Sequence, residues 1–223
     1  TAAVGFLIVH SLYKAALFMV VGAIDHATGT RDVAHLGGLR HAMPLTALAA
    51  ALAGASMAGL PPMIGWIGKE LLYAGSATLS PPALVTLGVL IANALMFAVA
   101  GIVAWRPFWG SRVTPPHSPH EAPWQMLAGP LLLGALGLVF GLGAGLVQPM
   151  VGATVTGSLA QPRAAAMHLW EGVNLPLLLS LTTFALGCVL YLTRDRGRAE
   201  IGAALARLPG FDPGWDRFLD WFR

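Results

Sequence analysis

A series of long apolar runs, separated by short polar or proline-containing stretches, constrains this chain more than any other feature. A helix needs about 20 apolar residues to cross the roughly 30 Å hydrocarbon core of a bilayer. Inside hydrocarbon a helix also satisfies its own backbone hydrogen bonds. The sequence therefore predicts an all-α integral membrane protein with about five transmembrane helices, in the segments 2–24, 44–78, 83–105, 126–149 and 174–193.

The composition excludes an ordinary soluble domain, because 56% of the residues are hydrophobic and only 10% are charged. The net charge of +3 comes almost entirely from arginines between or after the apolar runs, so we interpret it as a membrane-orientation signal and expect no nucleic acid partner. The positive-inside rule places the Arg194–Arg198 cluster in the cytoplasm. Counting back over five spans then places 25–43 and 106–125 on the cytoplasmic side, and the loops near 79–82 and 150–173 outside.

The second apolar run is too long to be one helix. Residues 44–78 would extend roughly 52 Å as a helix, at 1.5 Å per residue. Pro61 and Pro62 lack helical N–H donors, and Gly59, Gly65 and Gly68 loosen the backbone around them. The sequence thus predicts a discontinuous helix, which is tolerated at membrane depth only where it is buried in protein or lines a wet cavity.

A lysine near the middle of the first run is the first candidate functional residue. Lys14 lies roughly 18 Å from the start of the run along a helix axis. A cation at that depth costs at least ~2.5–3.5 kcal/mol on insertion scales, so it marks a functional site by default. His10 lies four residues before it, on the same helix face. The two side chains could form a proton relay; alternatively, Lys14 pairs with an acid elsewhere in the bundle, and His10 bonds a backbone carbonyl.

Further candidates lie at the helix break and at the end of the first run. Lys69 and Glu70 follow the break and could form a second protonation site, or a helix-end pair near the outer interface. His26 follows Asp25 at the cytoplasmic end of the first run, where it could admit or release protons, or interact with the free carbonyls of a helix end. The run His117–Glu121 is interpreted as a solvated loop, so we predict neither a metal site nor a cofactor.

These features divide the chain into four parts. We expect residues 1–105 to form a membrane domain that transports protons, 106–125 a cytoplasmic loop, and 126–193 two further transmembrane helices. We expect residues 194–223 to form a cytoplasmic or interfacial tail with a C-terminal amphipathic helix, in which Trp215, Phe218, Leu219 and Phe222 lie on one face and charged residues on the other. Because the chain starts inside a helix-like run, we expect it to be a piece of a longer protein.

Several motifs resemble those of one known family. The stretches HSLYKAALFMVVGAIDHATGTRD, LGGL and SMAGLPPMIGWIGKE resemble the A subunit of Mrp-type multisubunit Na⁺/H⁺ antiporters. That protein is similar to the antiporter-like, proton-pumping subunits of respiratory complex I. The DHATGTRD stretch and the later HEAPW and NLPLLLS stretches look specific to the Mrp antiporters, and the resemblance covers nearly all of the chain.

The resemblance implies a role for each candidate residue. Segments 2–24, 44–78 and 83–105 correspond to the last part of the second inverted helix repeat. Lys14 matches the central membrane lysine, His10 the histidine before it, and Lys69 the lysine of the broken helix near the outward proton exit. One position departs from the pattern, since Phe6 stands where family members often carry another histidine.

The resemblance also implies a function for the whole protein. We expect a proton-translocating subunit of a monovalent cation (Na⁺)/proton antiporter, which is part of a secondary transporter and not an enzyme. It would lie as a multi-pass protein in a prokaryotic plasma membrane. Its partners would be other membrane subunits, the lipid bilayer, protons and Na⁺. The alternatives are a proton-pumping subunit of complex I or of a membrane-bound hydrogenase, and a structural membrane scaffold whose lysines only pair with acids.

Overall fold

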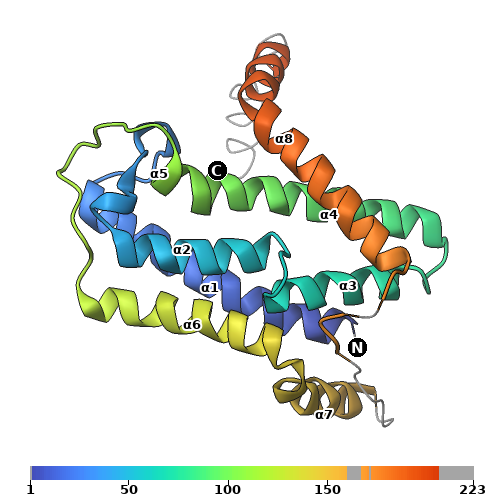
Figure 1. The fold of residues 1–223 in the computed structure, drawn as a ribbon. Coiled ribbons are helices and arrows are strands. Elements are labelled where there is room, and N and C mark those ends of the chain that lie inside the picture. The colour runs from blue at the N-terminus through green and yellow to red at the C-terminus, as the bar shows by residue number, and fades with distance from the viewer. Residues whose placement is uncertain (1, 160–166, 171, 206–223) are drawn as a thin grey trace, which may run out of the picture.

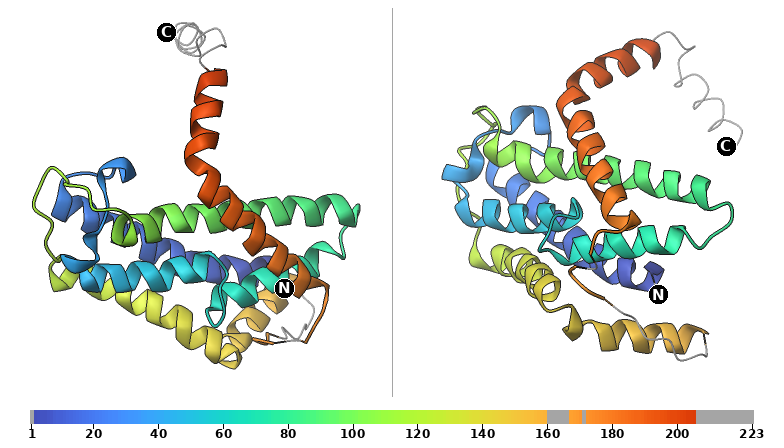
Figure 2. Two further views of the ribbon diagram at one scale, coloured as in Figure 1. Left: turned by 45° about the horizontal axis from the view of Figure 1, so that its top comes forward. Right: turned by 45° about the vertical axis from the view of Figure 1, so that its right-hand side comes forward.

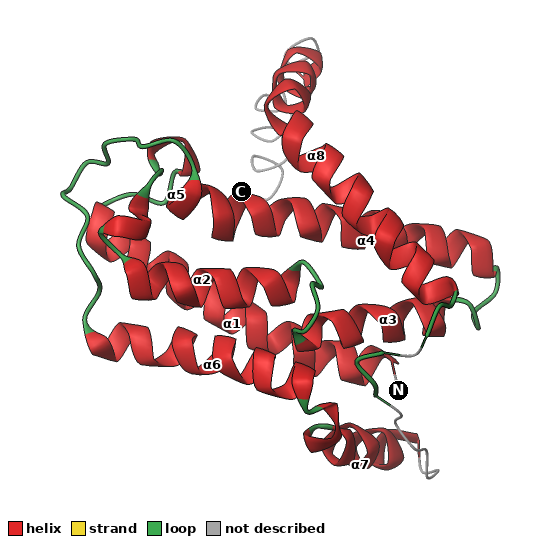
Figure 3. Ribbon diagram, in the orientation of Figure 1, coloured by secondary structure: helices red, strands yellow, loops and turns green. Residues whose placement is uncertain are grey.

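The computed structural model describes residues 2–159, 167–170 and 172–205, and these residues contain helices and loops but no strand (Figure 3). The predicted amphipathic helix near the C-terminus lies outside the described residues. The α-helices are α1 (Ala2–Thr28), α2 (Pro44–Met57), α3 (Ile64–Ser76), α4 (Pro82–Ala100), α5 (Arg106–Trp109), α6 (Trp124–Leu142), α7 (Gln148–Leu159) and α8 (Leu175–Leu205).

The all-α membrane fold predicted from the apolar runs is confirmed. Four continuous helical stretches of the described residues are long and apolar enough to cross a membrane: Ala2–Thr28, Pro82–Trp109, Trp124–Leu142 and Leu175–Ala203. The second of them joins α4 to α5 through the π-helical turn Gly101–Trp105. Helices α2 and α3 form the broken fifth element.

Two boundaries differ from the sequence prediction. The fourth apolar run ends as a helix at Leu142, and a separate helix, α7, begins at Gln148. Glycines at 141, 143 and 145 explain the early end, because glycine is a weak helix former. Helix α8 continues past residue 193 through the arginine cluster to Leu205, since nothing between 194 and 205 other than Gly197 and Gly202 opposes a helix.

The break between α2 and α3 is built by backbone hydrogen bonds that close the first helix. Gly59 adopts a left-handed conformation, with φ of 67°. Its N–H donates to Ser56 O at 3.0 Å, and the N–H of Leu60 donates to Ala55 O at 3.0 Å. This pair of bonds is the Schellman motif that ends helices at glycine. The two following prolines prevent the helix from restarting before Ile64.

The helices pack as a bundle in which α1 contacts α2, α3 and α6, while α4 contacts α8 (Figures 1 and 2). The loop from α1 to α2 and the loop from α5 to α6 lie at the same end of this bundle, and the loop from α3 to α4 lies at the opposite end (Figure 1). The stretches 25–43 and 106–125 were predicted to share one side of the membrane, and the bundle is consistent with this.

Candidate functional site

The helix break positions Lys69 as a buried cation. Helix α3 begins at Ile64, so Lys69 lies in its second turn and faces back toward the end of α2. Its side chain is only 3% exposed, and its Nζ donates a hydrogen bond to Gly59 O at 3.1 Å. Because Gly59 directly follows the last turn of α2, the ammonium group lies at the helix end that carries partial negative charge.

Two aromatic rings complete the surroundings of Lys69. Its Nζ lies 3.7 Å from the ring centroid of Phe184 and 4.8 Å from that of Trp66. A cation over the face of an aromatic ring is attracted by the ring quadrupole. Trp66 comes from the first turn of α3 and Phe184 from α8, so the site depends on a helix far along the chain. The position of α8 could not be inferred from the break alone.

Glu70 lies next to Lys69 but bonds a different helix. The hydroxyl of Ser180, on α8, donates to Glu70 Oε1, and Ser180 is fully buried. One turn further along α3, the hydroxyl of Tyr73 bonds Thr183 Oγ1, also on α8. Glu70 was predicted as a site residue from the sequence, whereas the hydroxyls of Ser180 and Thr183 were not. Their spacing of three residues within an apolar helix, on the face of Phe184, is the signal that could have identified them.

His10 and Lys14 lie on α1, away from the break. His10 Nδ1 is 2.8 Å from Tyr13 OH, and its ring centroid lies 5.6 Å from that of Phe6. Lys14 is partly exposed, and within residues 2–159, 167–170 and 172–205 it has no hydrogen bond or ion pair. The structure therefore does not bring Lys14 into contact with Lys69, although α1 and α3 pack together through Val9 and Gly68.

His26 is exposed near the opposite end of α1. Its ring centroid lies 6.3 Å from that of His120, in the loop from α5 to α6. The neighbouring Asp25 forms an ion pair with Arg31, with 3.2 Å between Oδ2 and Nε. His26 is thus not in contact with Lys14 or Lys69. The predicted proton path is distributed over three separate places.

Glu121 corrects the prediction that the run His117–Glu121 is only a solvated loop. Its carboxylate accepts hydrogen bonds from Leu45 N at 2.7 Å and from Thr46 N at 3.4 Å, and a third from Thr46 Oγ1 at 2.5 Å. The two N–H groups belong to the first turn of α2, which starts at Pro44 and has no side-chain cap hydrogen bond at its N-cap residue, Met43. A carboxylate here satisfies free donors and complements the helix dipole. Glu121 therefore fixes the start of the broken helix.

Asp32 organises the loop from α1 to α2. Its Oδ1 accepts from Ala34 N at 2.9 Å and its Oδ2 lies 3.1 Å from His35 Nδ1. The hydrogen bond from Ala34, with the bond and charge of His35, lowers the pKa of Asp32 below its usual value. Asp32 therefore caps the 3₁₀ turn Val33–His35 as a carboxylate.

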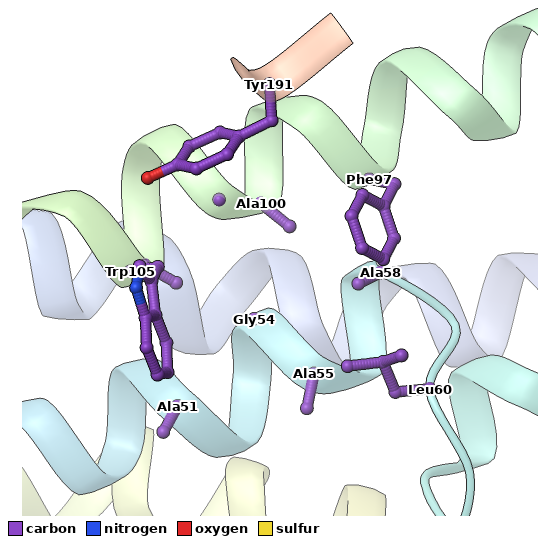
Figure 4. Close-up of a pocket in the computed structure, with 11 residues that line it drawn as sticks. Ala51, Gly54, Ala55, Ala58, Leu60, Phe97, Ala100, Trp105 and Tyr191 are labelled. Carbon is purple, nitrogen blue, oxygen red and sulfur yellow. The ribbon is translucent and has the colours of Figure 1, made fainter. Parts of the chain in front are cut away.

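An apolar cavity of about 240 Å³ lies between α2, α4 and α8 (Figure 4). Its walls are small residues of α2 and α4, such as Gly54 and Ala100, together with the rings of Phe97, Trp105 and Tyr191. None of the described residues that line it carries a charge. We therefore assign no step of ion transfer to this cavity.

The first part of the chain matches a known membrane family. Residues 1–95 match the membrane family of NADH:quinone oxidoreductases and Mrp antiporters. This part of the chain is similar to that family. The matched region contains α1, α2, α3 and most of α4, and therefore Lys14, Lys69 and the break between α2 and α3.

The relatives and a solved structure extend the similarity beyond residue 95. The chain is 34% identical over 210 residues to the A subunit of the Na⁺/H⁺ antiporter of Alkalihalophilus pseudofirmus, and 35% identical over 206 residues to the A1 subunit of Staphylococcus haemolyticus. Each alignment covers 86% of this chain and 26% of the relative. The Mrp complex of Dietzia sp. DQ12-45-1b matches with a TM-score of 0.78 and 29% identity, over 99% of this chain and 24% of that chain.

These matches confirm the resemblance to the A subunit of Mrp antiporters and the antiporter-like fold. The chain spans about a quarter of the length of the curated relatives that it matches. Together with the apolar helices, the bacterial relatives identify it as a multi-pass protein of a bacterial plasma membrane.

Proposed function

We propose that this chain forms part of a proton-translocating membrane subunit of a monovalent cation/proton antiporter, with Na⁺ as the cation. The observation that carries the proposal is the buried Lys69 at the break between α2 and α3, held by a helix-end carbonyl and two aromatic rings. The similarity to the A subunits of Na⁺/H⁺ antiporters supports it. The chain is then part of a secondary transporter, which works with other membrane subunits.

Lys69 suits a proton-carrying role by its chemistry. A lysine can release its proton within a protein, whereas an arginine effectively cannot. The Gly59 carbonyl and the faces of Trp66 and Phe184 stabilise the ammonium form. Because this carbonyl belongs to the glycine that ends α2, a small movement at the break changes how well the ammonium is held. A helix break of this kind suits alternating gain and loss of a proton.

We assign the other candidate residues to one water-filled proton route that also includes Lys69. His10 and Lys14 relay protons within the membrane, Glu70 accompanies Lys69, and His26 admits or releases protons at the cytoplasmic end. Since these groups are not in direct contact, water molecules connect them. Na⁺ crosses elsewhere in the complex.

Substitution of the two lysines tests the proposal in the full-length complex. Lys69→Ala and Lys14→Ala should each abolish Na⁺/H⁺ exchange in everted membrane vesicles, while the complex still assembles. Lys69→Arg should restore little activity, because arginine does not give up its proton. Arg40→Ala, which changes an exposed cation in a loop, is the matched control and should exchange at the wild-type rate. Wild-type exchange in Lys69→Ala, or full activity in Lys69→Arg, would contradict the proposed role of Lys69.

A redox-linked proton-pumping subunit is the second candidate, because the family that residues 1–95 match also includes NADH:quinone oxidoreductases. The two candidates differ in their source of energy. An antiporter exchanges Na⁺ for protons down an imposed proton gradient without an electron donor. Proton movement that requires NADH and stops with its oxidation would favour the second candidate.

A further inference from the structure

Helix α8 meets α3 through a band of buried hydroxyl groups. Ser180 and Thr183 are both fully buried, and they bond Glu70 and Tyr73 respectively. Phe184, on the same face of α8, covers Lys69. Helix α8 therefore contacts the ionisable pair of the break and the next turn of α3. It lies entirely beyond residue 95, where the family match ends.

This hydroxyl band continues from α3 to α4. Ser76 is 3% exposed, and its Oγ lies 2.9 Å from Thr86 Oγ1 and donates to Tyr73 O at 2.9 Å. Asn93 lies beside the Tyr73 hydroxyl and is 8% exposed. Its Nδ2 is buried and has no hydrogen-bond acceptor in the described part of the chain. Buried donors of this kind are generally satisfied by ordered water.

The band has a direction along the bundle. Lys69, Tyr73 and Ser76 follow one another at spacings of four and three residues, so they lie on one face of α3. At 1.5 Å per residue, this face leads roughly 10 Å from Lys69 toward the end of α3. That end joins α4 through residues 77–81, opposite the loops that carry Arg31, Arg40 and Arg112 (Figure 1).

Buried hydroxyl groups can pass protons on, which apolar side chains cannot do. A hydroxyl can accept a proton on its oxygen while its own proton passes to the next acceptor, so a proton moves on and no charge stays behind. A threonine in an apolar helix normally bonds only its own backbone. Thr183 Oγ1 does donate to Leu179 O at 2.9 Å, but it also bonds Tyr73 across the helix interface. Burying such polar groups is costly unless they are bonded, as they are here.

We propose that α8 supplies part of the proton route: the hydroxyls of Ser180 and Thr183, with Tyr73, Ser76, Thr86 and Asn93, connect Lys69 and Glu70 to the α3–α4 end of the bundle. This inference rests on the proposed function. The proposed function already uses Lys69. The inference adds the route that leads away from Lys69 and a role for α8.

Removal of single hydroxyls tests the route in the assembled antiporter. Thr183→Val keeps the shape of the side chain and removes the hydroxyl, and Tyr73→Phe removes its partner. Each should slow Na⁺/H⁺ exchange about tenfold per assembled complex, which corresponds to about 1.4 kcal/mol in the barrier. Thr183→Ser keeps the hydroxyl and should retain most of the activity. The matched control is Thr182→Val, because the neighbouring Thr182 is exposed and, among the described residues, bonds only Leu178 O, at 2.9 Å.

A structural role for Thr183 predicts a different outcome. If the route is correct, the ratio of exchange rates in H₂O and D₂O should rise in Thr183→Val, because proton transfer becomes slower than the other steps. A lower rate with an unchanged ratio would overturn the inference. Wild-type exchange in Thr183→Val and Tyr73→Phe, together with an inactive Lys69→Ala, would overturn the route and leave the proposed function intact. Full exchange in Lys69→Ala would instead overturn the proposed function itself.

Discussion

Single residues far apart in the chain fix the two ends of helix α2. At its end, Gly59 adopts positive φ, and a Cβ added there would lie 3.1 Å from both Cδ and Cε of Lys69. A glycine at this position thus allows both the helix stop and the close approach of the lysine. At its start, Glu121 supplies the cap from 76 residues away in sequence. Two residues therefore hold the helix on which the candidate site depends.

The Glu121 cap makes a prediction about stability. Glu121→Ala leaves the N–H groups of Leu45 and Thr46 and the Thr46 hydroxyl without their acceptor, so the protein should lose about 1–3 kcal/mol of stability. Glu121→Gln keeps one acceptor oxygen and should lose less. Thermal unfolding of the purified complex measures both changes. His120→Ala changes an exposed neighbour in the same loop and should leave the melting temperature unchanged. Equal melting temperatures for Glu121→Ala and wild type would show that the cap contributes nothing.

The same residues show which features the sequence could predict and which contacts it could not. The position of Lys69 just after prolines and glycines was enough to predict a lysine beside a helix break. Its partner Phe184, and the bond from Glu121 to Leu45, could not be predicted, because they join segments far apart in sequence. Such contacts depend on how the helices pack, and the apolar periodicity of a membrane helix does not specify its neighbours.

At the scale of elements, the break is held by close packing of α6. An added Cβ at Gly141 would lie 2.0 Å from Pro62 O and 2.6 Å from Ile64 N, which is the backbone of the break itself. Gly65, at the start of α3, is packed as tightly, because a Cβ added there would lie 1.7 Å from Ser56 O. The fourth apolar run is rich in glycine, which allows helices to pack closely. Its contact with the break was not visible in the sequence.

Two glycines of α6 provide a matched pair of substitutions. Gly141→Ala should displace the backbone between α2 and α3, so we expect little assembled complex and no measurable exchange. Gly137→Ala places its Cβ 3.7 Å from Ser56 Oγ, an ordinary contact, and should be tolerated. Quantifying the protein in membranes, with vesicle exchange assays, compares the two. Normal assembly and exchange in Gly141→Ala would show that α6 does not hold the break in this conformation.

At the scale of the whole molecule, the charges of the loops and the arrangement of the bundle agree. The loops from α1 to α2 and from α5 to α6 share one end and carry Arg31, Arg40 and Arg112, whereas residues 77–81 at the other end have no charge (Figures 1 and 2). From the positive-inside rule we propose that the arginine-bearing end is cytoplasmic. In this orientation Lys69 and the hydroxyl band lie toward the outer half of the membrane, and His26 lies at the cytoplasmic end.

Cysteine labelling from the two sides of the membrane tests this orientation. In the full-length protein with its other cysteines replaced, including Cys188→Ser, a membrane-impermeant maleimide should label Thr78→Cys in intact cells and Ser111→Cys only in everted vesicles. Both positions are exposed in loops, so the thiols should react readily. Labelling of both variants from the same side would mean that the α3–α4 loop and the α5–α6 loop do not lie across the membrane from each other. Lys69 and Glu70 would then have no assigned outer exit, and the hydroxyl band would have no solvent to meet at the α3–α4 end.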